Sequence, residues 1–171
     1  VGKHEFLEFL RDCGFSSLNK PADFYGEGLA LGNGEVTLFE LVQGYAALAN
    51  RGMLRSLRVT LGNQTLHTPV SGHELVTPEV SSIIGDILSD PQARRYEFGS
   101  DGLLRFPVQT AVKTGTSTDY RDAWAIGYSD AFTVGVWMGN LNRSSMSEIS
   151  GARGPALVLR SVFAELHRSR E

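Results

Sequence analysis

The chain has 171 residues, of which 42% are hydrophobic and 20% are charged, and its formal net charge is −3. This size and composition predict one globular domain with a single core rather than a disordered chain. A weak negative charge without a basic run argues against nucleic-acid binding. No apolar run approaches the length of a membrane span.

Cysteine and histidine usage predicts neither a disulfide nor a metal centre. The single Cys13 excludes an internal disulfide, and it falls in the apolar stripe or the C-terminal turn of the first predicted helix, where a structural thiol is expected. None of the four histidines has a partner at metal-ligand spacing. We therefore expect no metal and no other cofactor.

The first third of the chain reads as two helices joined by a loop. Residues 1–13 have amphipathic spacing and stop at a glycine. Residues 14–35 are rich in Gly, Pro and Asp and predict a loop. Thr37 is a candidate N-cap, and Glu40 completes a capping box. That helix should end at 50–52, an Asn-Arg-Gly sequence.

The middle of the chain is less regular. Residues 54–66 suggest a small hairpin with its turn near Gly62-Asn63. Thr77-Pro78-Glu79 is a strong helix start, and the helix should run to about Leu88 or Ser89. Residues 91–106 are expected to form a loop with three apolar side chains tucked inward, namely Phe98, Leu103 and Leu104.

Three strands and a helix are predicted at the C-terminal end. The strands cover 108–116, 123–129 and 132–139, and their short turns imply antiparallel neighbours. A final helix should cover Pro155–Arg168. We expect its apolar residues to pack on the sheet: Leu157, Val158, Val162, Phe163 and Leu166. The predicted class is α+β, a three-stranded antiparallel sheet packed with helices.

The first of these strands carries Lys113-Thr114-Gly115-Thr116, which has the residue types that acyl transfer at a serine requires. Lys113 supplies a fixed positive charge near a substrate carboxylate. Thr114 and Thr116 share one face of the strand and offer hydroxyls there. Gly115 points the other way, and we expect its missing side chain to let another element pack closely. The backbone N–H of Thr116 is the expected second donor of an oxyanion hole.

A Lys-Thr-Gly tripeptide alone occurs by chance in many proteins, and its surroundings make it more specific. Residues 111–128, with the sequence AVKTGTSTDYRDAWAIGY, resemble the transpeptidase domain of class A penicillin-binding proteins, particularly the 1C subgroup. Other blocks resemble the family in the same order: 29–37, 45–52, 132–140 and 150–155. The resemblance covers nearly the whole chain.

This resemblance implies the C-terminal part of a transpeptidase domain, residues 1–171, with a partial serine β-lactamase-like fold. It implies a periplasmic D,D-transpeptidase that cross-links peptidoglycan stem peptides and binds β-lactam antibiotics, in a parent protein anchored in the bacterial inner membrane. Lys113 and Thr116 would be catalytic, and Lys113, Thr114, Gly115 and Thr116 would bind substrate. Asp122 and Trp124 match recurrent positions with a role that is partly structural.

The chain departs from the family pattern where the nucleophile is concerned. Ser17-Leu18-Asn19-Lys20 satisfies both Ser-x-x-Lys and Ser-x-Asn, but Pro21 disfavours helical backbone at Lys20. We interpret this segment as a solvated loop and expect the family's serine, its paired lysine and its Ser-x-Asn motif upstream of residue 1. The fragment alone should therefore be inactive.

Two further expectations remain open. The alternative function is a non-catalytic peptide-binding or interaction module that uses the strand edge 113–116. The family's sheet has five strands, and the two additional ones would lie beside 132–139. The isolated chain is therefore expected to self-associate through residues 132–138, unless the 91–106 or 140–154 segment covers that edge.

Overall fold

The computed structural model describes residues 1–59, 72–98, 104–147 and 149–168. The fold is α+β, as predicted. In chain order its elements are α1 (Lys3–Asp12), α2 (Ala22–Tyr25), the 3-10 helix η1 (Gly26–Leu31), α3 (Leu38–Ala49), β1 (Met53–Arg55), β2 (Gly72–Glu74), α4 (Pro78–Ser89), α5 (Pro91–Phe98), β3 (Ala111–Thr116), the 3-10 helix η2 (Thr118–Tyr120), β4 (Asp122–Tyr128), β5 (Thr133–Gly139) and α6 (Pro155–Arg168).

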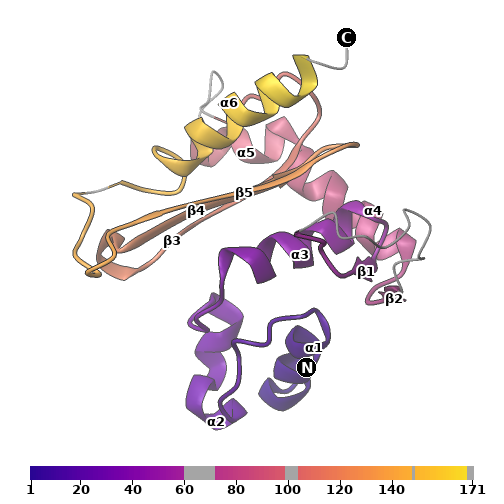
Figure 1. The fold of residues 1–171 in the computed structure, drawn as a ribbon, viewed down its shortest axis with the longest axis vertical. Coiled ribbons are helices and arrows are strands. Elements are labelled where there is room, and N and C mark those ends of the chain that lie inside the picture. The colour runs from indigo at the N-terminus through magenta and orange to yellow at the C-terminus, as the bar shows by residue number, and fades with distance from the viewer. Residues whose placement is uncertain (60–71, 99–103, 148, 169–171) are drawn as a thin grey trace.

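The central feature is an antiparallel sheet with the strand order β3-β4-β5, which confirms the three predicted strands and their pairing. Helix α6 covers one face of the sheet and α3 the other (Figure 1). A Cβ on Gly135 would lie 2.5 Å from the Val42 side chain of α3, so only a glycine lets α3 approach β5 this closely. On the opposite face, α6 and the strands share a core of buried residues: Leu104, Val112, Ala125, Ala156, Leu159 and Phe163.

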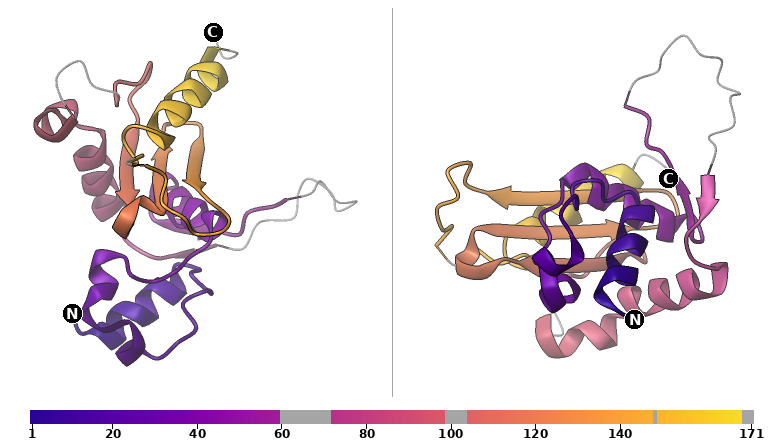
Figure 2. Two further views of the ribbon diagram at one scale, coloured as in Figure 1. Left: turned by 90° about the vertical axis from the view of Figure 1, so that its left-hand side faces the viewer. Right: turned by 90° about the horizontal axis from the view of Figure 1, so that it is seen from below.

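The N-terminal helices form a second, smaller core. Helices α1, α2 and η1 pack on one another, away from the sheet and beyond α3 (Figures 1 and 2). Their buried residues are Leu7, Leu18, Ala22, Tyr25 and Leu29. Cys13 ends α1 and is 8% exposed. Burial, together with the nearby Asp12, raises the pKa of its thiol to about 11, so the thiolate form is disfavoured.

The predicted helix starts at Thr37 and Thr77 are confirmed. Each threonine hydroxyl accepts a hydrogen bond from the backbone N–H three residues later, and Glu40 completes the capping box of α3. The expected turn at Gly62-Asn63 lies outside the described residues. Strands β1 and β2, on either side of that region, pair antiparallel in a separate two-stranded sheet. No described helix has the length and apolar character needed to cross a bilayer.

Two of the predicted loops contain helices, so those predictions were wrong in part. The 14–35 segment holds α2 and η1, and each is followed by a glycine with positive φ, Gly26 and Gly32 respectively. The 91–106 segment begins with α5. Its start repeats the cap-and-proline pattern seen at α4, because Asp90 Oδ1 accepts a hydrogen bond from Gln92 N at 2.7 Å and Pro91 is the first helical residue. The expected burial of Leu104 is confirmed, at 6% exposed, whereas Leu103 and the Phe98 side chain lie outside the described part.

The boundaries of α6 match the prediction, and its buried face matches in part, because Phe163 packs in the core as expected. The residues in contact with the sheet follow the spacing Ala156, Leu159 and Phe163, each fully buried. Val158 is 41% exposed, although we expected it to pack on the sheet. The helix is apolar around much of its circumference, so periodicity alone does not select the side that meets the sheet.

Candidate functional site

The Lys-Thr-Gly-Thr sequence forms the end of β3, at an edge of the sheet. Lys113 is opposite Ile126 of β4, Gly115 is opposite Trp124 and Thr116 is opposite Ala123. Among the described strands, only β4 pairs with β3. The outer edge of β3 therefore presents backbone N–H and C=O groups to which an extended peptide can add as a strand.

Side chains of this sequence alternate between the two faces of the sheet. Val112 packs in the core beneath α6, so alternation places Thr114 and Thr116 on that same face. Lys113 and Gly115 lie on the opposite face of the sheet, on which α3 contacts β4 and β5. Lys113 is exposed, and its Nζ donates a hydrogen bond to the Thr114 carbonyl at 2.7 Å.

Thr116 has a partner that the sequence did not indicate. Its Oγ1 accepts a hydrogen bond of 3.0 Å from the backbone N–H of Gly151, in the loop between β5 and α6. A hydroxyl that accepts in this way still has its own proton to donate. Thr116 can therefore hold the loop in place and donate to a ligand at the same time.

The expectation that Gly115 permits close packing was wrong, and the glycine that does so is Gly151. A Cβ on Gly115 would meet only the Trp124 side chain, at 3.7 Å, which is ordinary contact. A Cβ on Gly151 would lie 2.6 Å from the carbonyl oxygens of both Gly115 and Trp124. The loop thus approaches the backbone of β3 and β4 through its own glycine.

Residues after the motif brace the turn between β3 and β4. Asp122 accepts a hydrogen bond from Trp137 Nε1 at 3.0 Å and another from Ser117 Oγ at 3.2 Å. The Ser117 hydroxyl in turn accepts from the Asp122 backbone N–H at 2.8 Å. The rings of Trp124 and Trp137 lie 6.2 Å apart between centroids. In the structure Asp122 and Trp124 thus stabilise the end of β3.

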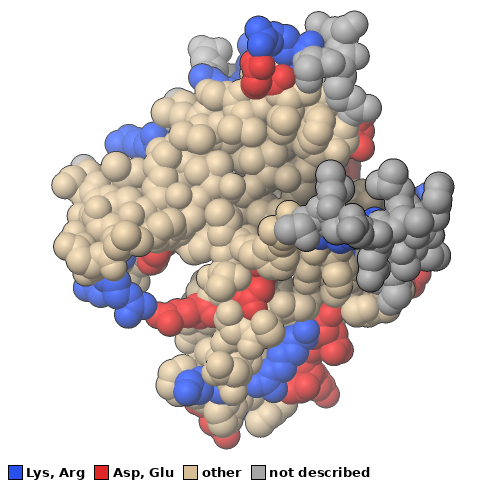
Figure 3. Space-filling model, in the orientation of Figure 1, with Lys and Arg blue, Asp and Glu red and all other residues tan. Residues whose placement is uncertain are grey.

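A cleft of about 550 Å³ opens beside this turn. Three separate segments line it: the residue Glu35 before α3, the β3–β4 turn, and the end of β5 with the loop after it. Figure 3 shows an opening between the sheet and the N-terminal helices, with acidic and basic side chains facing each other beside it. The lining residues are Glu35, Ser117, Thr118, Asp119, Arg121, Asp122, Trp137, Asn140, Leu141 and Arg143.

Two ion pairs occupy the cleft. Arg121 Nη2 lies 3.3 Å from Asp119 Oδ2 within the turn. Arg143 pairs with Glu35, which is 108 residues earlier in the chain, and links the loop after β5 to the segment before α3. Sequence reasoning missed Glu35, Arg121 and Arg143 as site residues. For Glu35 and Arg143 the reason is that no local pattern marks two charges that only the fold brings together.

The Ser17-Leu18-Asn19-Lys20 segment does not open a helix. It was expected to be a solvated loop, which is wrong in part, because Leu18 is 2% exposed and belongs to the N-terminal core. Ser17 N donates a 2.7 Å hydrogen bond to Glu40 Oε1. Lys20 is exposed, and residues 17–20 are not helical. Ser17 and Lys20 therefore do not lie one helical turn apart, as the serine and lysine of a Ser-x-x-Lys helix do.

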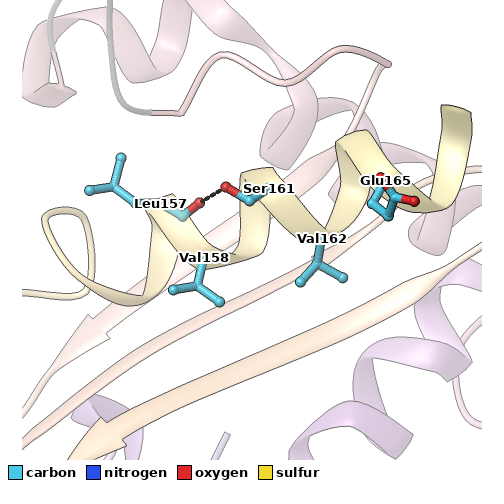
Figure 4. A pocket seen from close by; sticks show the side chains of 5 residues that line it. All are labelled: Leu157, Val158, Ser161, Val162 and Glu165. Atoms are coloured by element: carbon cyan, nitrogen blue, oxygen red, sulfur yellow. Dashed lines mark hydrogen bonds between the residues drawn. The ribbon is translucent and has the colours of Figure 1, made fainter.

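A second surface depression, of about 410 Å³, lies on α6 (Figure 4). It is formed by Leu157, Val158, Ser161, Val162 and Glu165. Ser161 Oγ donates its hydrogen bond back to the Leu157 carbonyl at 3.0 Å, as Figure 4 shows. The polar groups of this depression do not converge on a common point. It therefore resembles a ligand site less than the cleft beside β3 does.

The sequence is similar to several penicillin-binding proteins. It is 33% identical over 138 residues to penicillin-binding protein 1C of Escherichia coli (strain K12), a match that covers 81% of this chain and 17% of that protein. Penicillin-binding protein 1A of Aquifex aeolicus (strain VF5) is 31% identical over 165 residues, covering 90% and 21%. The chain thus spans about a fifth of the length of these curated relatives. No family model matches it.

Solved structures share the fold. A peptidoglycan glycosyltransferase from Burkholderia ambifaria superposes with a TM-score of 0.72 at 16% identity, covering 99% of this chain and 57% of that one. Penicillin-binding protein 1A from Haemophilus influenzae gives a TM-score of 0.71 at 20% identity, covering 96% and 31%. The similarity therefore extends over the whole arrangement of helices and strands and is not confined to β3.

Proposed function

We propose that residues 1–171 are the C-terminal portion of the transpeptidase domain of a class A penicillin-binding protein, of the 1C-like subgroup. The observation that carries this proposal is the exposed Lys113 on an edge strand whose outer backbone groups pair with no described strand. The sequence similarity to penicillin-binding proteins 1C and 1A supports it.

In this proposal β3 is the substrate-binding edge. Lys113 attracts the carboxylate of a peptidoglycan stem peptide or of a β-lactam, and the hydroxyls of Thr114 and Thr116 offer hydrogen-bond donors to substrate on the other face of the strand. The backbone N–H of Thr116 stabilises the oxyanion that forms during acylation. Gly115 exposes the strand backbone between the two threonines. These groups bind and orient, but none is a nucleophile.

The serine nucleophile, its lysine and one oxyanion donor would come from another part of a longer protein. The small share of the relatives that this chain spans is consistent with that. Such a protein would act at the periplasmic face of the bacterial inner membrane as a serine-type D-Ala-D-Ala transpeptidase. The chain by itself would then bind without acylation, and a binding module at 113–116 remains the alternative function.

The proposal is tested by changing Lys113 to Ala in the full-length protein and measuring acylation by a fluorescent penicillin. Loss of a charge that stabilises the transition state should slow acylation about 100-fold or more. Stability should change little because Lys113 is exposed. Lys20→Ala is the matched control, since Lys20 is also an exposed lysine but lies in the dismissed Ser-x-x-Lys segment. An unchanged rate in Lys113→Ala would remove this lysine from the site.

The isolated chain provides a second test. We expect no covalent penicillin adduct after denaturing electrophoresis, because acylation needs an activated hydroxyl. Mass spectrometry of tryptic peptides would locate any label. A label on Ser17 would refute two claims: that this chain lacks a nucleophile, and that Ser17-Leu18-Asn19-Lys20 is not the catalytic motif.

A further inference from the structure

The position of the edge strand β3 depends on the segment that leads into it. Among the described strands, only β4 pairs with β3. Residues 104–110 lead into β3, and both ends of this segment are buried, at Leu104 and Thr110. Leu104 belongs to the same buried cluster as Val112, which precedes Lys113 in β3. Because such a core is closely packed, a shift of Leu104 is passed through it to the residue beside Lys113.

The C-terminal end of helix α4 lies next to this segment. Helix α4 contacts β3, and Figure 2 shows it beside that strand. Ser89, the last residue of α4, is buried, and its Oγ accepts a hydrogen bond from Gln109 Nε2 at 3.3 Å. The end of α4 and the entry to β3 are therefore in direct contact.

Arg94 of α5 joins these two parts of the fold. Its Nη2 donates a hydrogen bond to the Ser89 carbonyl at 2.9 Å, and its Nε donates to the Asp90 carbonyl at 3.3 Å. Its Nη1 donates to the Leu104 carbonyl at 3.3 Å. One planar guanidinium thus contacts the end of α4 and the start of the 104–110 segment at the same time.

The chemistry of Arg94 suits this position. The last carbonyl groups of a helix have no partner within the helix and carry partial negative charge, which a cation stabilises. Arg94 is half-buried; burial lowers its pKa, while the charge of Asp90 acts to raise it. Its three hydrogen bonds to backbone carbonyls come from a rigid fork of donors. A lysine cannot reproduce them, because its ammonium is a compact point charge.

We propose that Arg94 is a positioning residue for acylation, which fixes the entry to β3 and through it the place of Lys113. The inference rests on the proposed function, because that function assigns Lys113 to the substrate carboxylate. Arg94 acts through the backbone and core contacts of residues 104–112 and does not itself contact the substrate. Catalytic geometry tolerates little displacement, since a misplacement of about 1 Å can slow a reaction about 100-fold.

The test measures acylation of the full-length protein by a fluorescent penicillin in Arg94→Gln and Arg94→Lys. The final amount of label counts the protein that is folded, and the rate constant describes each folded molecule. The rate constant should fall about tenfold in both variants, less than for the loss of a group that contacts the substrate. A purely structural role would instead lower the final amount of label and leave the rate constant unchanged. Arg95→Gln is the matched control, because Arg95 is the neighbouring arginine of α5 and is exposed.

A double-mutant cycle with Lys113→Ala identifies the group through which Arg94 acts. Lys113→Ala alone should slow acylation about 100-fold. Adding Arg94→Gln should then slow it by less than about twofold more, because the group that Arg94 positions is already absent. Independent effects would multiply, and a double variant about tenfold slower than Lys113→Ala would overturn the proposal.

The outcomes separate this inference from the proposed function. If Lys113→Ala slows acylation but both Arg94 variants keep the wild-type rate constant, the positioning role is refuted while the proposed function stands. The same holds if the two effects multiply. If Lys113→Ala is acylated at the wild-type rate, the assignment of Lys113 in the proposed function fails, and the positioning role fails with it.

Discussion

Glu40 joins the N-terminal helices to α3, and replacing it with Gln should reveal how much that junction stabilises the fold. The side chain is 6% exposed. Its Oε2 accepts hydrogen bonds from Thr37 N and Thr37 Oγ1 at 2.9 and 3.0 Å. Its Oε1 accepts from Ser16 Oγ and Ser17 N at 2.8 and 2.7 Å. A glutamine has one acceptor oxygen, so its amide group would face two of these donors.

The pKa of Glu40 indicates the size of the effect. Burial acts to raise this pKa, but the hydrogen bonds from Thr37, Ser17 and Ser16 outweigh it and lower the pKa from 4.5 to about 2. A carboxyl group with such a depressed pKa contributes about 3 kcal/mol to the free energy of unfolding at neutral pH. Because the folded-state pKa is the lower one, this contribution is complete above about pH 5 and is lost as the pH falls toward 2.

Urea unfolding of the wild type and of Glu40→Gln at pH 7 and pH 3 measures this contribution. We expect a loss of about 2–3 kcal/mol at pH 7 and a much smaller difference at pH 3, where protonation weakens the wild type as well. Glu5→Gln is the matched control: Glu5 Oε2 accepts a hydrogen bond from the N-cap nitrogen of α1, Gly2 N, at 3.1 Å, but the side chain is exposed, so its loss should stay below about 0.5 kcal/mol. A Glu40→Gln loss under about 1 kcal/mol, or an equal loss at both pH values, would refute this reasoning.

Two further predictions concern the sheet. Gly151→Ala should lower the free energy of unfolding by about 1–3 kcal/mol, because the new Cβ would meet the carbonyl oxygens of Gly115 and Trp124. Gly115→Ala should be tolerated, because its Cβ would make only ordinary contact. Equal urea midpoints for the two variants would contradict this prediction. The isolated chain should self-associate at micromolar concentration through residues 132–138, because no described strand pairs with the outer edge of β5 and all its residues are half-exposed. Light scattering that shows a clean monomer would count against edge pairing.

Local signals were sufficient for most elements. Thr37 with Glu40 and Thr77 with Pro78 marked two helix starts, because a cap satisfies backbone groups within four residues of itself. The three strands followed from alternation and short turns. The helix α5 was missed although Asp90-Pro91 carries the same start signal as Thr77-Pro78.

The candidate site also has some features that the local sequence predicts and others that only the fold sets. The amino-acid sequence by itself determined the α+β class, the strand that carries Lys113-Thr114-Gly115-Thr116 and the similarity to penicillin-binding proteins, because these depend on residue order over short distances. Only the tertiary structure decided which face of α6 is buried. It also decided that Thr116 Oγ1 accepts a hydrogen bond from Gly151 N, and that Arg143 forms an ion pair with Glu35 across a cleft. Those contacts join segments tens of residues apart, and their physical origin is the packing of loops against a sheet, for which no local pattern exists.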